Sequence, residues 1–311
     1  MALYRDALPQ LGDEVFLSDS GLETILVFHH DVDLPEFASF PLVDDESGVA
    51  LLREYYASHT LLAQRSGVGI VLETPTWRAN GDWGAKLGYD EGALAAVNRA
   101  AVELVVEVRG QAGPPVVVSG CIGPRGDAYR PESLMTTDES QAYHRMQVDV
   151  LAGTAVDLVT AMTLTYAAEA IGIVRAAEAA GVPVVISFTV ETDGLLPDGS
   201  SLGSAIVEVD EATGSYASYF MVNCAHPTHF DDVLTRDAPW MQRICGVRAN
   251  ASRMSHQELD SAPELDDGDP VELGEQYAAL RERHPHISVL GGCCGTDLRH
   301  VEQIALACVA R

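Results

Sequence analysis

Eight short apolar runs, each rich in β-branched residues, constrain the fold of this 311-residue chain more than any other feature of its sequence. Most of these runs are nearly continuous in hydrophobicity and do not alternate between apolar and polar residues. Strands that are buried on both faces of a parallel sheet have this pattern. The sequence therefore predicts parallel strands at residues 15–20, 68–74, 116–120, 157–163, 183–189, 219–224, 244–250 and 287–292.

Segments with a helical spacing of apolar residues lie between these runs. We expect helices at residues 47–65, 91–109, 138–152, 166–180, 269–283 and 297–310. Regular alternation of strand and helix predicts a single (β/α)8 TIM barrel, a fold of about 250 residues. An open, doubly wound sheet is the alternative, because counting strands does not prove closure. No linker or break in composition divides the chain, so we predict one domain, residues 1–311.

The charge of the chain limits its partners. It has 46 acidic and 19 basic residues, a formal net charge of −27, and Lys86 is its only lysine. Such a surface repels phosphate backbones and anionic lipids, so we expect neither nucleic-acid nor membrane partners. The acid excess suits a salt-rich environment, where self-repulsion is screened; a GC-rich genome would also explain arginine in place of lysine.

The start of the chain and its hydropathy indicate where the protein works. No basic segment followed by an apolar one opens the sequence, and no run approaches the roughly 18 apolar residues of a membrane helix. We therefore expect a cytoplasmic protein. Its six cysteines then favour metal binding or burial over disulfides.

Polar and reactive side chains collect where the predicted strands end. Asp19 follows the first strand, Glu73 ends the second, and Cys224 ends the sixth. Cys293 and Cys294 follow the eighth. In a barrel the carboxyl ends of all strands meet at one mouth, so we expect these residues to converge there. The longer connections, 23–45, 75–90, 124–137 and 251–268, would crowd the same mouth.

The strongest chemical signal is the segment Gly-Gly-Cys-Cys-Gly at residues 291–295. Flanking glycines let the backbone turn so that Cys293 and Cys294 can reach one ion. Cys224 would supply a third thiolate. Three protein ligands with one open tetrahedral position are typical of a catalytic zinc, whereas a structural zinc has four. The alternative is a tight turn that carries two buried free cysteines.

The remaining cysteines and two nearby histidines do not fit the same site. We expect Cys121, Cys245 and Cys308 not to be ligands, because their spacing matches no metal motif, and we expect them to be buried thiols instead. His226 and His229 follow Cys224 closely, yet we do not assign them as ligands.

The chain resembles the homocysteine S-methyltransferase family, including its betaine-dependent members, over essentially its whole length. Several motifs carry this resemblance. Val-Asn-Cys at 222–224 and Gly-Gly-Cys-Cys-Gly at 291–295 are similar to the family's two zinc motifs. Leu-Ser-Asp-Ser-Gly at 17–21 resembles its opening, with Ser20 in place of a glycine, and Ser-Phe-Thr at 187–189 resembles another family segment. The resemblance implies a (β/α)8 barrel, zinc on Cys224, Cys293 and Cys294, and a substrate thiol at the open position.

One position departs from the family. After the fourth strand the family has a glutamate that binds the amino group of the acceptor, and an ungapped alignment places Met162 there. Methionine cannot pair with an ammonium group. Either Glu73, together with Asp19, supplies the charge, or the acceptor is a thiol without an α-amino group.

The expected chemistry is methyl transfer to a thiol. A free thiol has a pKa of about 8.5, and coordination to zinc deprotonates it. Its sulfur would then attack a sulfonium or quaternary ammonium donor, with no protein nucleophile. Trp77, Trp83 and Tyr129 lie in loops at the expected mouth, where an aromatic face could bind a methylated cation.

Three functions remain open at this point: methyl transfer to homocysteine, forming methionine; the same transfer to a different thiol; and a non-catalytic metal-binding barrel. The expected partners are a small-molecule thiol acceptor and a methyl donor, with Zn²⁺ as cofactor. A homo-oligomer is compatible with the sequence.

Overall fold

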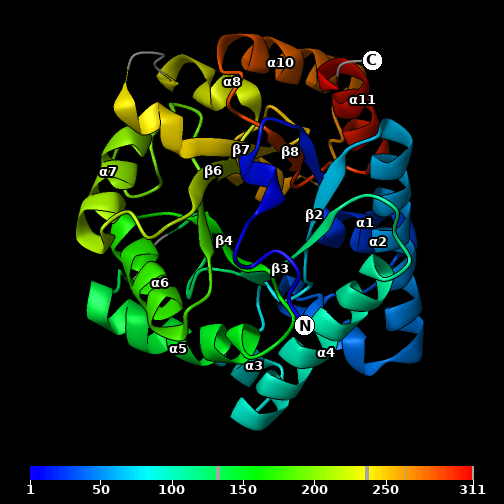
Figure 1. The fold of residues 1–311 in the computed structure, drawn as a ribbon, viewed down its shortest axis with the longest axis vertical. Coiled ribbons are helices and arrows are strands. Elements are labelled where there is room, and N and C mark those ends of the chain that lie inside the picture. The colour runs from blue at the N-terminus through cyan, green and yellow to red at the C-terminus, as the bar shows by residue number, and fades with distance from the viewer. Residues whose placement is uncertain (131–133, 235–237, 263, 310–311) are drawn as a thin grey trace.

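The strands close into a barrel. The structure is a computed structural model that describes residues 1–130, 134–234, 238–262 and 264–309. In these residues eight parallel strands pair in sequence order, and β1 pairs with β8 (Figure 1). The strands are β1 (Phe16–Ser18), β2 (Gly69–Glu73), β3 (Val116–Ile122), β4 (Leu158–Leu164), β5 (Val184–Phe188), β6 (Tyr219–Asn223), β7 (Ile244–Ala249) and β8 (Val289–Gly292). The predicted barrel is confirmed, and each strand end lies within two residues of its prediction.

Helices surround the barrel (Figure 1). They are α1 (Leu22–His30), α2 (Glu46–Ser66), α3 (Gly81–Lys86), α4 (Glu91–Arg109), α5 (Thr137–Ala152), α6 (Ala167–Ala180), α7 (Leu202–Thr213), α8 (Pro227–Phe230), α9 (His256–Ser261), α10 (Pro270–Arg283) and α11 (Leu298–Cys308). The six predicted helices are confirmed; Ala310, the predicted end of the last one, lies outside the described residues. None of the described helices is both long and apolar enough to span a bilayer.

Five of the described helices, α1, α3, α7, α8 and α9, were not predicted from the sequence, and the two longest of them are α1 and α7. Both are rich in β-branched or aromatic residues, which have weak helix propensity. Packing against the barrel decides their conformation instead: Leu26 of α1, and Ile206 and Val209 of α7, are buried in the main core. The connection 23–45, predicted to be a loop, therefore begins with a helix.

Two hydrophobic clusters hold the barrel together. Side chains such as Leu17, Ile70 and Val118 point outward and pack against the helices. The adjacent residues of the same strands, such as Phe16, Val71 and Val117, face the opposite side of the sheet and form a separate cluster. Every strand residue except Cys245 is buried, in accord with the near-continuous apolar runs.

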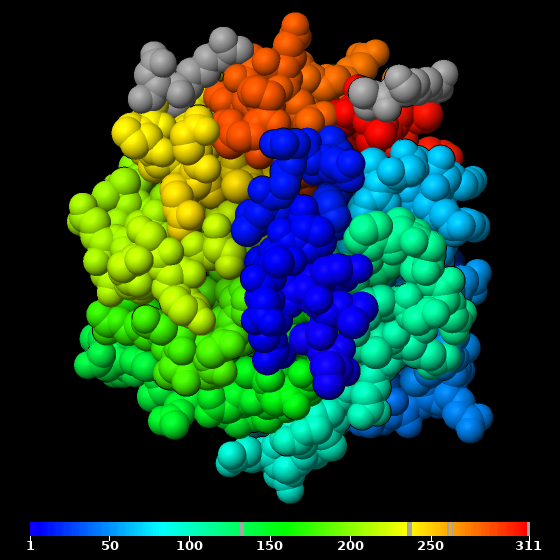
Figure 2. Space-filling model, in the orientation of Figure 1, coloured from blue at the N-terminus to red at the C-terminus, as the bar shows by residue number. Residues whose placement is uncertain are grey.

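The N-terminal segment covers one end of the barrel. Buried Asp157, which immediately precedes β4, accepts hydrogen bonds from the backbone N–H groups of Leu3 and Tyr4 and forms an ion pair with Arg109. Figure 2 shows the segment (blue) running across the centre of this face. This end, where the strands begin, is thereby covered, and the candidate site lies at the other end.

Candidate active site

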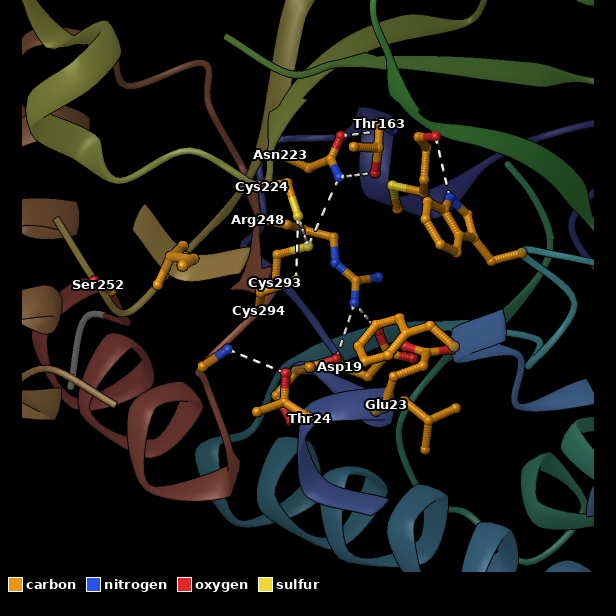
Figure 3. A pocket seen from close by; sticks show the side chains of 18 of the residues that line it. Asp19, Glu23, Thr24, Thr163, Asn223, Cys224, Arg248, Ser252, Cys293 and Cys294 are labelled. Carbon is orange, nitrogen blue, oxygen red and sulfur yellow. Dashed lines mark hydrogen bonds and ion pairs between the residues drawn. The ribbon is translucent and has the colours of Figure 1, made fainter. Parts of the chain in front are cut away.

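A cavity of about 450 Å³ opens where the strands end. Seven strands or the residues that follow them contribute to its wall, and Figure 3 shows some of the side chains that line it. The strand-end residues are Asp19, Glu73, Cys121, Met162, Asn223, Arg248 and Cys293. The convergence expected from the sequence is therefore present. Asn223 belongs to the Val-Asn-Cys motif at 222–224, and Arg248 is an additional member that was not predicted.

Three thiols form a compact group in this cavity (Figure 3). The Sγ of Cys224 lies 2.9 Å from that of Cys293 and 3.4 Å from that of Cys294. All three sulfurs lie within 4.8 Å of one another, and no disulfide joins them. In a tetrahedral site with Zn–S bonds of about 2.3 Å, sulfurs lie about 3.8 Å apart. The group fits such an ion after outward movements of less than about 1 Å.

Backbone geometry explains why glycines flank the cysteine pair. Gly295 has a φ of +78°, which glycine adopts without strain. Gly291 and Gly292 serve a different purpose: a Cβ at Gly292 would lie 2.1 Å from Oγ1 of Thr296, and one at Gly291 would lie 2.4 Å from Oγ of Ser18. Gly291 permits close approach of β1, and Gly292 leaves room for Thr296 of the same turn, so the expectation that the glycines provide a turn holds only for Gly295.

The three thiols differ in their affinity for a proton. Hydrogen bonds from Cys224 and Cys294, aided by the nearby guanidinium of Arg248, lower the pKa of Cys293 well below the usual value for a thiol. The same interaction raises the pKa of Cys224 and of Cys294. Cys293 is therefore the first of the three to ionise.

An aromatic pair covers one side of the thiols. The hydroxyl of Tyr129 lies 3.1 Å from Sγ of Cys224 and 3.8 Å from Sγ of Cys294. The ring of His256 stacks on Tyr129 at 4.0 Å, and its Nε2 donates to the backbone oxygen of Cys224. Tyr129 therefore lies in contact with the cysteines. His256, on the connection after β7, was not predicted because nothing in its local sequence indicates a site residue.

Asn223 orients the strand ends next to the thiols. Its Oδ1 accepts from the backbone N–H of Thr163 and from Oγ of Ser187, and its Nδ2 donates to Oγ1 of Thr163. Nδ2 also lies 3.7 Å from Sγ of Cys293. Thr163 has a φ of +63°, a strained value for a β-branched residue, which these hydrogen bonds hold in place.

A buried charge cluster lies below the thiols in the view of Figure 3. Oδ1 of Asp19 is 2.5 Å from Nη2 of Arg248, and Oδ2 of Asp19 accepts from the backbone N–H of Glu73. Arg248 also donates to the backbone oxygens of Gly292 and Ser20. Burial raises the pKa of Glu73 to about 7, against the opposing effect of Arg248. The sequence does contain one signal for Arg248, a charged residue inside an otherwise apolar strand.

Met162 and Trp77 form the wall nearest the end of β4. A β-bulge between Ala161 and Leu164 contains Met162, which is buried and faces the cavity. The indole N–H of Trp77 donates to the backbone oxygen of Met162 at 3.3 Å. The methionine seen in the sequence therefore does occupy the cavity wall.

The second tryptophan of this loop is engaged elsewhere. The guanidinium of Arg78 lies 3.6 Å from the ring centroid of Trp83, and Nζ of Lys86 lies 3.8 Å from it. Trp77 lines the cavity but Trp83 does not, so Trp83 is not placed to bind a substrate cation.

The other cysteines and the two histidines stay outside the thiol group. In the part of the chain that the structure describes, only Cys224, Cys293 and Cys294 form a cluster suited to a metal. Cys121 lines the cavity, and Cys308 is buried in the main core. Cys245 is only partly buried, so the expectation of a buried thiol is wrong there. His226 accepts the N–H of Thr228 as a helix cap, and His229 contacts the backbone oxygen of Arg253.

Comparisons with known proteins agree with these motifs. No curated protein sequence matches the chain. Among solved structures, the oxidized form of the homocysteine methyltransferase MmuM from Escherichia coli has a TM-score of 0.77 at 21% identity and covers 97% of this chain and 98% of its own. The metallated form has a TM-score of 0.74 at 20% identity, with 94% and 96% covered. Residues 19–308 match the family described as homocysteine S-methyltransferase. The chain belongs to the homocysteine S-methyltransferase family.

Proposed function

We propose that the protein is a zinc-dependent S-methyltransferase that transfers a methyl group to homocysteine and forms methionine. The observation that carries the proposal is the group of three free thiols, Cys224, Cys293 and Cys294, at the wall of an open cavity. Family membership supports the reaction class, and the existence of a metallated form of the E. coli protein supports a metal. Among the described residues the group has three thiols and no fourth cysteine, a set that suits zinc with one exchangeable position.

The chain's own residues would hold and orient the reactants. Cys224, Cys293 and Cys294 would bind the ion, and Asn223 would fix the position of Cys293 through its contact at 3.7 Å. A bound zinc ion would lower the pKa of the acceptor thiol. No protein nucleophile is needed: as the acceptor's S–CH3 bond forms, the donor's bond to the same methyl breaks and the electron pair returns to the donor, which leaves uncharged.

Acidic residues around the cavity favour a cationic donor. Glu23, Asp127, Glu264 and Asp266 line it. A sulfonium or a quaternary ammonium would be attracted by these carboxylates. We propose Trp77, which faces the cavity, as an aromatic contact of the methylated cation.

Recognition of the acceptor's ammonium group is assigned to Glu73 and Asp19. Both are buried at the cavity floor, where Met162 offers no charge. The second candidate function, the same transfer to a thiol without an amino group, is favoured by Met162 alone. The third, a non-catalytic metal-binding barrel, would bind zinc but transfer no methyl group.

The first test measures metal content and methyl transfer together. We expect about one zinc per chain, lost together with methyl transfer in Cys224→Ala, Cys293→Ala and Cys294→Ala, because two thiolates bind zinc far more weakly than three. Cys121→Ser and Cys308→Ser are matched controls that should keep the zinc. Methyl transfer should be assayed with homocysteine and with simpler thiols, each against sulfonium and quaternary ammonium donors.

The outcomes separate the candidates. Full zinc occupancy in a Cys293→Ala, Cys294→Ala double variant would contradict the assigned site. Zinc without transfer to any thiol would favour the metal-binding barrel, and transfer only to thiols without an amino group would favour the second candidate.

We further propose that residues 1–311 act as one domain in the cytoplasm, with small molecules as the only substrates. The closed barrel and the family match over residues 19–308 support a single unit. Light scattering of the purified chain would determine whether it forms a homo-oligomer.

A further inference from the structure

The guanidinium of Arg248 has hydrogen-bonding capacity that the protein does not use. Arg248 is 7% exposed, and its Nη1 is buried without a hydrogen-bond partner. Nε and Nη2 are occupied by the backbone oxygens of Gly292 and Ser20, and Nη2 also contacts Asp19. An unpaired N–H on a buried charged group is costly, so such a group is expected to have a partner in the functional state.

Arg248, the residue that carries the unused nitrogen, lines the cavity that holds the thiols. Cys224 and Cys293 line the same cavity. In Figure 3 its side chain extends from the level of the cysteines to Asp19. A ligand whose sulfur lies at the thiol group can therefore place a polar group of its own next to Arg248.

A second unused atom, of opposite character, lines the same cavity. Oε2 of Glu73 is buried without a hydrogen-bond partner, and Glu73 is 7% exposed. Among the described residues no ion pair joins Glu73 to Arg248, although the charge of each shifts the pKa of the other. The cavity floor thus presents one unfilled donor and one unfilled acceptor.

We propose that Nη1 of Arg248 binds the carboxylate of the acceptor thiol, which makes Arg248 a specificity-determining residue. This inference rests on the proposed function, since it concerns the acceptor of that reaction. The planar guanidinium matches a carboxylate, and its hydrogen bonds to one are charge-assisted. Glu73 would bind the ammonium group of the same molecule, so Arg248 and Glu73 together would recognise the zwitterion of an α-amino acid.

Asp19 has a different part in this arrangement. Its contact with Nη2 neutralises Arg248, so the site attracts a carboxylate through an unfilled hydrogen bond and not through excess positive charge. The same contact reduces the capacity of Asp19 to bind an ammonium group, which leaves that task mainly to Glu73.

The test uses thioether products, whose binding requires neither zinc nor turnover. Methionine carries both charged groups. 4-(Methylthio)butanoate carries only the carboxylate, and 3-(methylthio)propylamine carries only the amine. Calorimetric titration of the wild-type protein should show that loss of the carboxylate weakens binding by about 10- to 100-fold. Equal affinity for methionine and the amine, or binding of none of the three, would overturn the proposal.

Variants then assign the effect to Arg248. Arg248→Met alone would leave Asp19 buried and unpaired, so it is combined with Asp19→Asn to keep the fold. The double variant should bind methionine and the amine with similar affinity. The Asp19→Asn single variant should bind 4-(methylthio)butanoate more tightly than wild type, an effect that a purely structural arginine would not give.

A matched control removes an arginine–aspartate pair away from the cavity. Arg243 pairs with Asp210 at 2.7 Å, and neither lines the cavity. The Arg243→Met, Asp210→Asn variant should keep the full preference for the carboxylate. An unchanged preference in the Arg248 double variant would contradict the assignment. If the protein shows the preference for the carboxylate but contains no zinc, this inference stands and the proposed function fails.

Discussion

At the scale of single residues, the site is built from polar groups that the fold removes from water. Glu73 is the clearest case, since burial raises its pKa to about 7 from an ordinary value of 4.5. Arg248 opposes that shift, and Asp19 adds to it. A carboxyl group in this condition changes charge near neutral pH, where an acceptor's ammonium group could favour its ionised form.

The raised pKa predicts how stability depends on pH. The folded protein binds the proton of Glu73 more tightly than the unfolded chain, so stability falls as pH rises from about 4.5 to about 7. Replacement by glutamine removes this dependence. Between pH of about 5 and about 8, Glu73→Gln should gain about 2 kcal/mol in free energy of unfolding relative to wild type.

Urea unfolding of both proteins at the two pH values measures this difference. Comparing the two proteins cancels the titration of the thiols and of all other shared groups. A difference that does not change with pH, or that changes in favour of wild type as pH rises, would show that Glu73 is ionised throughout the range.

At the scale of elements, the turn between β8 and α11 positions two of the three thiols. Gly291 lets this turn approach β1, and Gly292 leaves room for Thr296 within the turn. The backbone N–H of Gly292 donates to the backbone oxygen of Asp19. The cysteine pair is therefore placed by contact between the first and last strands of the barrel, and the turn by itself does not position it.

A methyl group at position 292 should disturb this contact. The added Cβ would lie 2.1 Å from Oγ1 of Thr296 and 2.7 Å from its Cβ, so the turn must shift. We expect Gly292→Ala to reduce the free energy of unfolding by about 1–3 kcal/mol, as overpacking does. Zinc affinity should fall at least about tenfold, because the ligands lose their alignment.

Gly126→Ala is the control, because a Cβ there meets nothing within 4 Å. Gly126→Ala should leave the free energy of unfolding and the zinc affinity equal to those of wild type within experimental error. Unchanged zinc affinity in Gly292→Ala, measured by competition with a chelator, would show that the turn can move without affecting the thiols.

At the scale of the whole molecule, a net charge of −27 acts against the compact state. Several basic residues of the described surface take part in ion pairs such as Arg53–Glu107 and Arg125–Asp82, but in the whole chain acidic residues outnumber basic ones by more than two to one. Repulsion among the remaining carboxylates is screened as salt is added, because the Debye length falls from about 10 Å at 0.1 M to about 3 Å at 1 M.

The melting temperature should therefore rise by several degrees between about 0.1 M and about 1 M NaCl. Calorimetry at constant pH measures this shift. Replacing exposed Glu54, Glu103 and Glu208 with glutamine should raise the melting temperature at low salt and reduce the effect of NaCl. A melting temperature that falls with NaCl, or an effect of equal size in the glutamine variant, would assign the response to something other than charge repulsion.

Local pattern was sufficient for much of the fold and for part of the site. Hydrophobic run length predicted all eight strands, and apolar spacing predicted six helices, because both signals depend on neighbours in the chain. The cysteine pair was visible for the same reason, since Cys293 and Cys294 are adjacent and lie between glycines. Helices α1 and α7, the longest of the five that were missed, have residues of weak helix propensity and adopt helix only against the barrel.

Only the tertiary structure decided closure of the barrel and the contacts that closure creates. Pairing of β1 with β8 brings Asp19 to Arg248 and brings Gly292 to Asp19, although these residues are far apart in the chain. Tyr129, in the connection after β3, and His256, at the start of α9, meet at the thiols in the same way, although nothing in either local sequence indicates the other. Charge, run length and motif are local properties that a sequence displays directly. Which buried donor is left without a partner, as at Nη1 of Arg248, depends on the position of every neighbour in space.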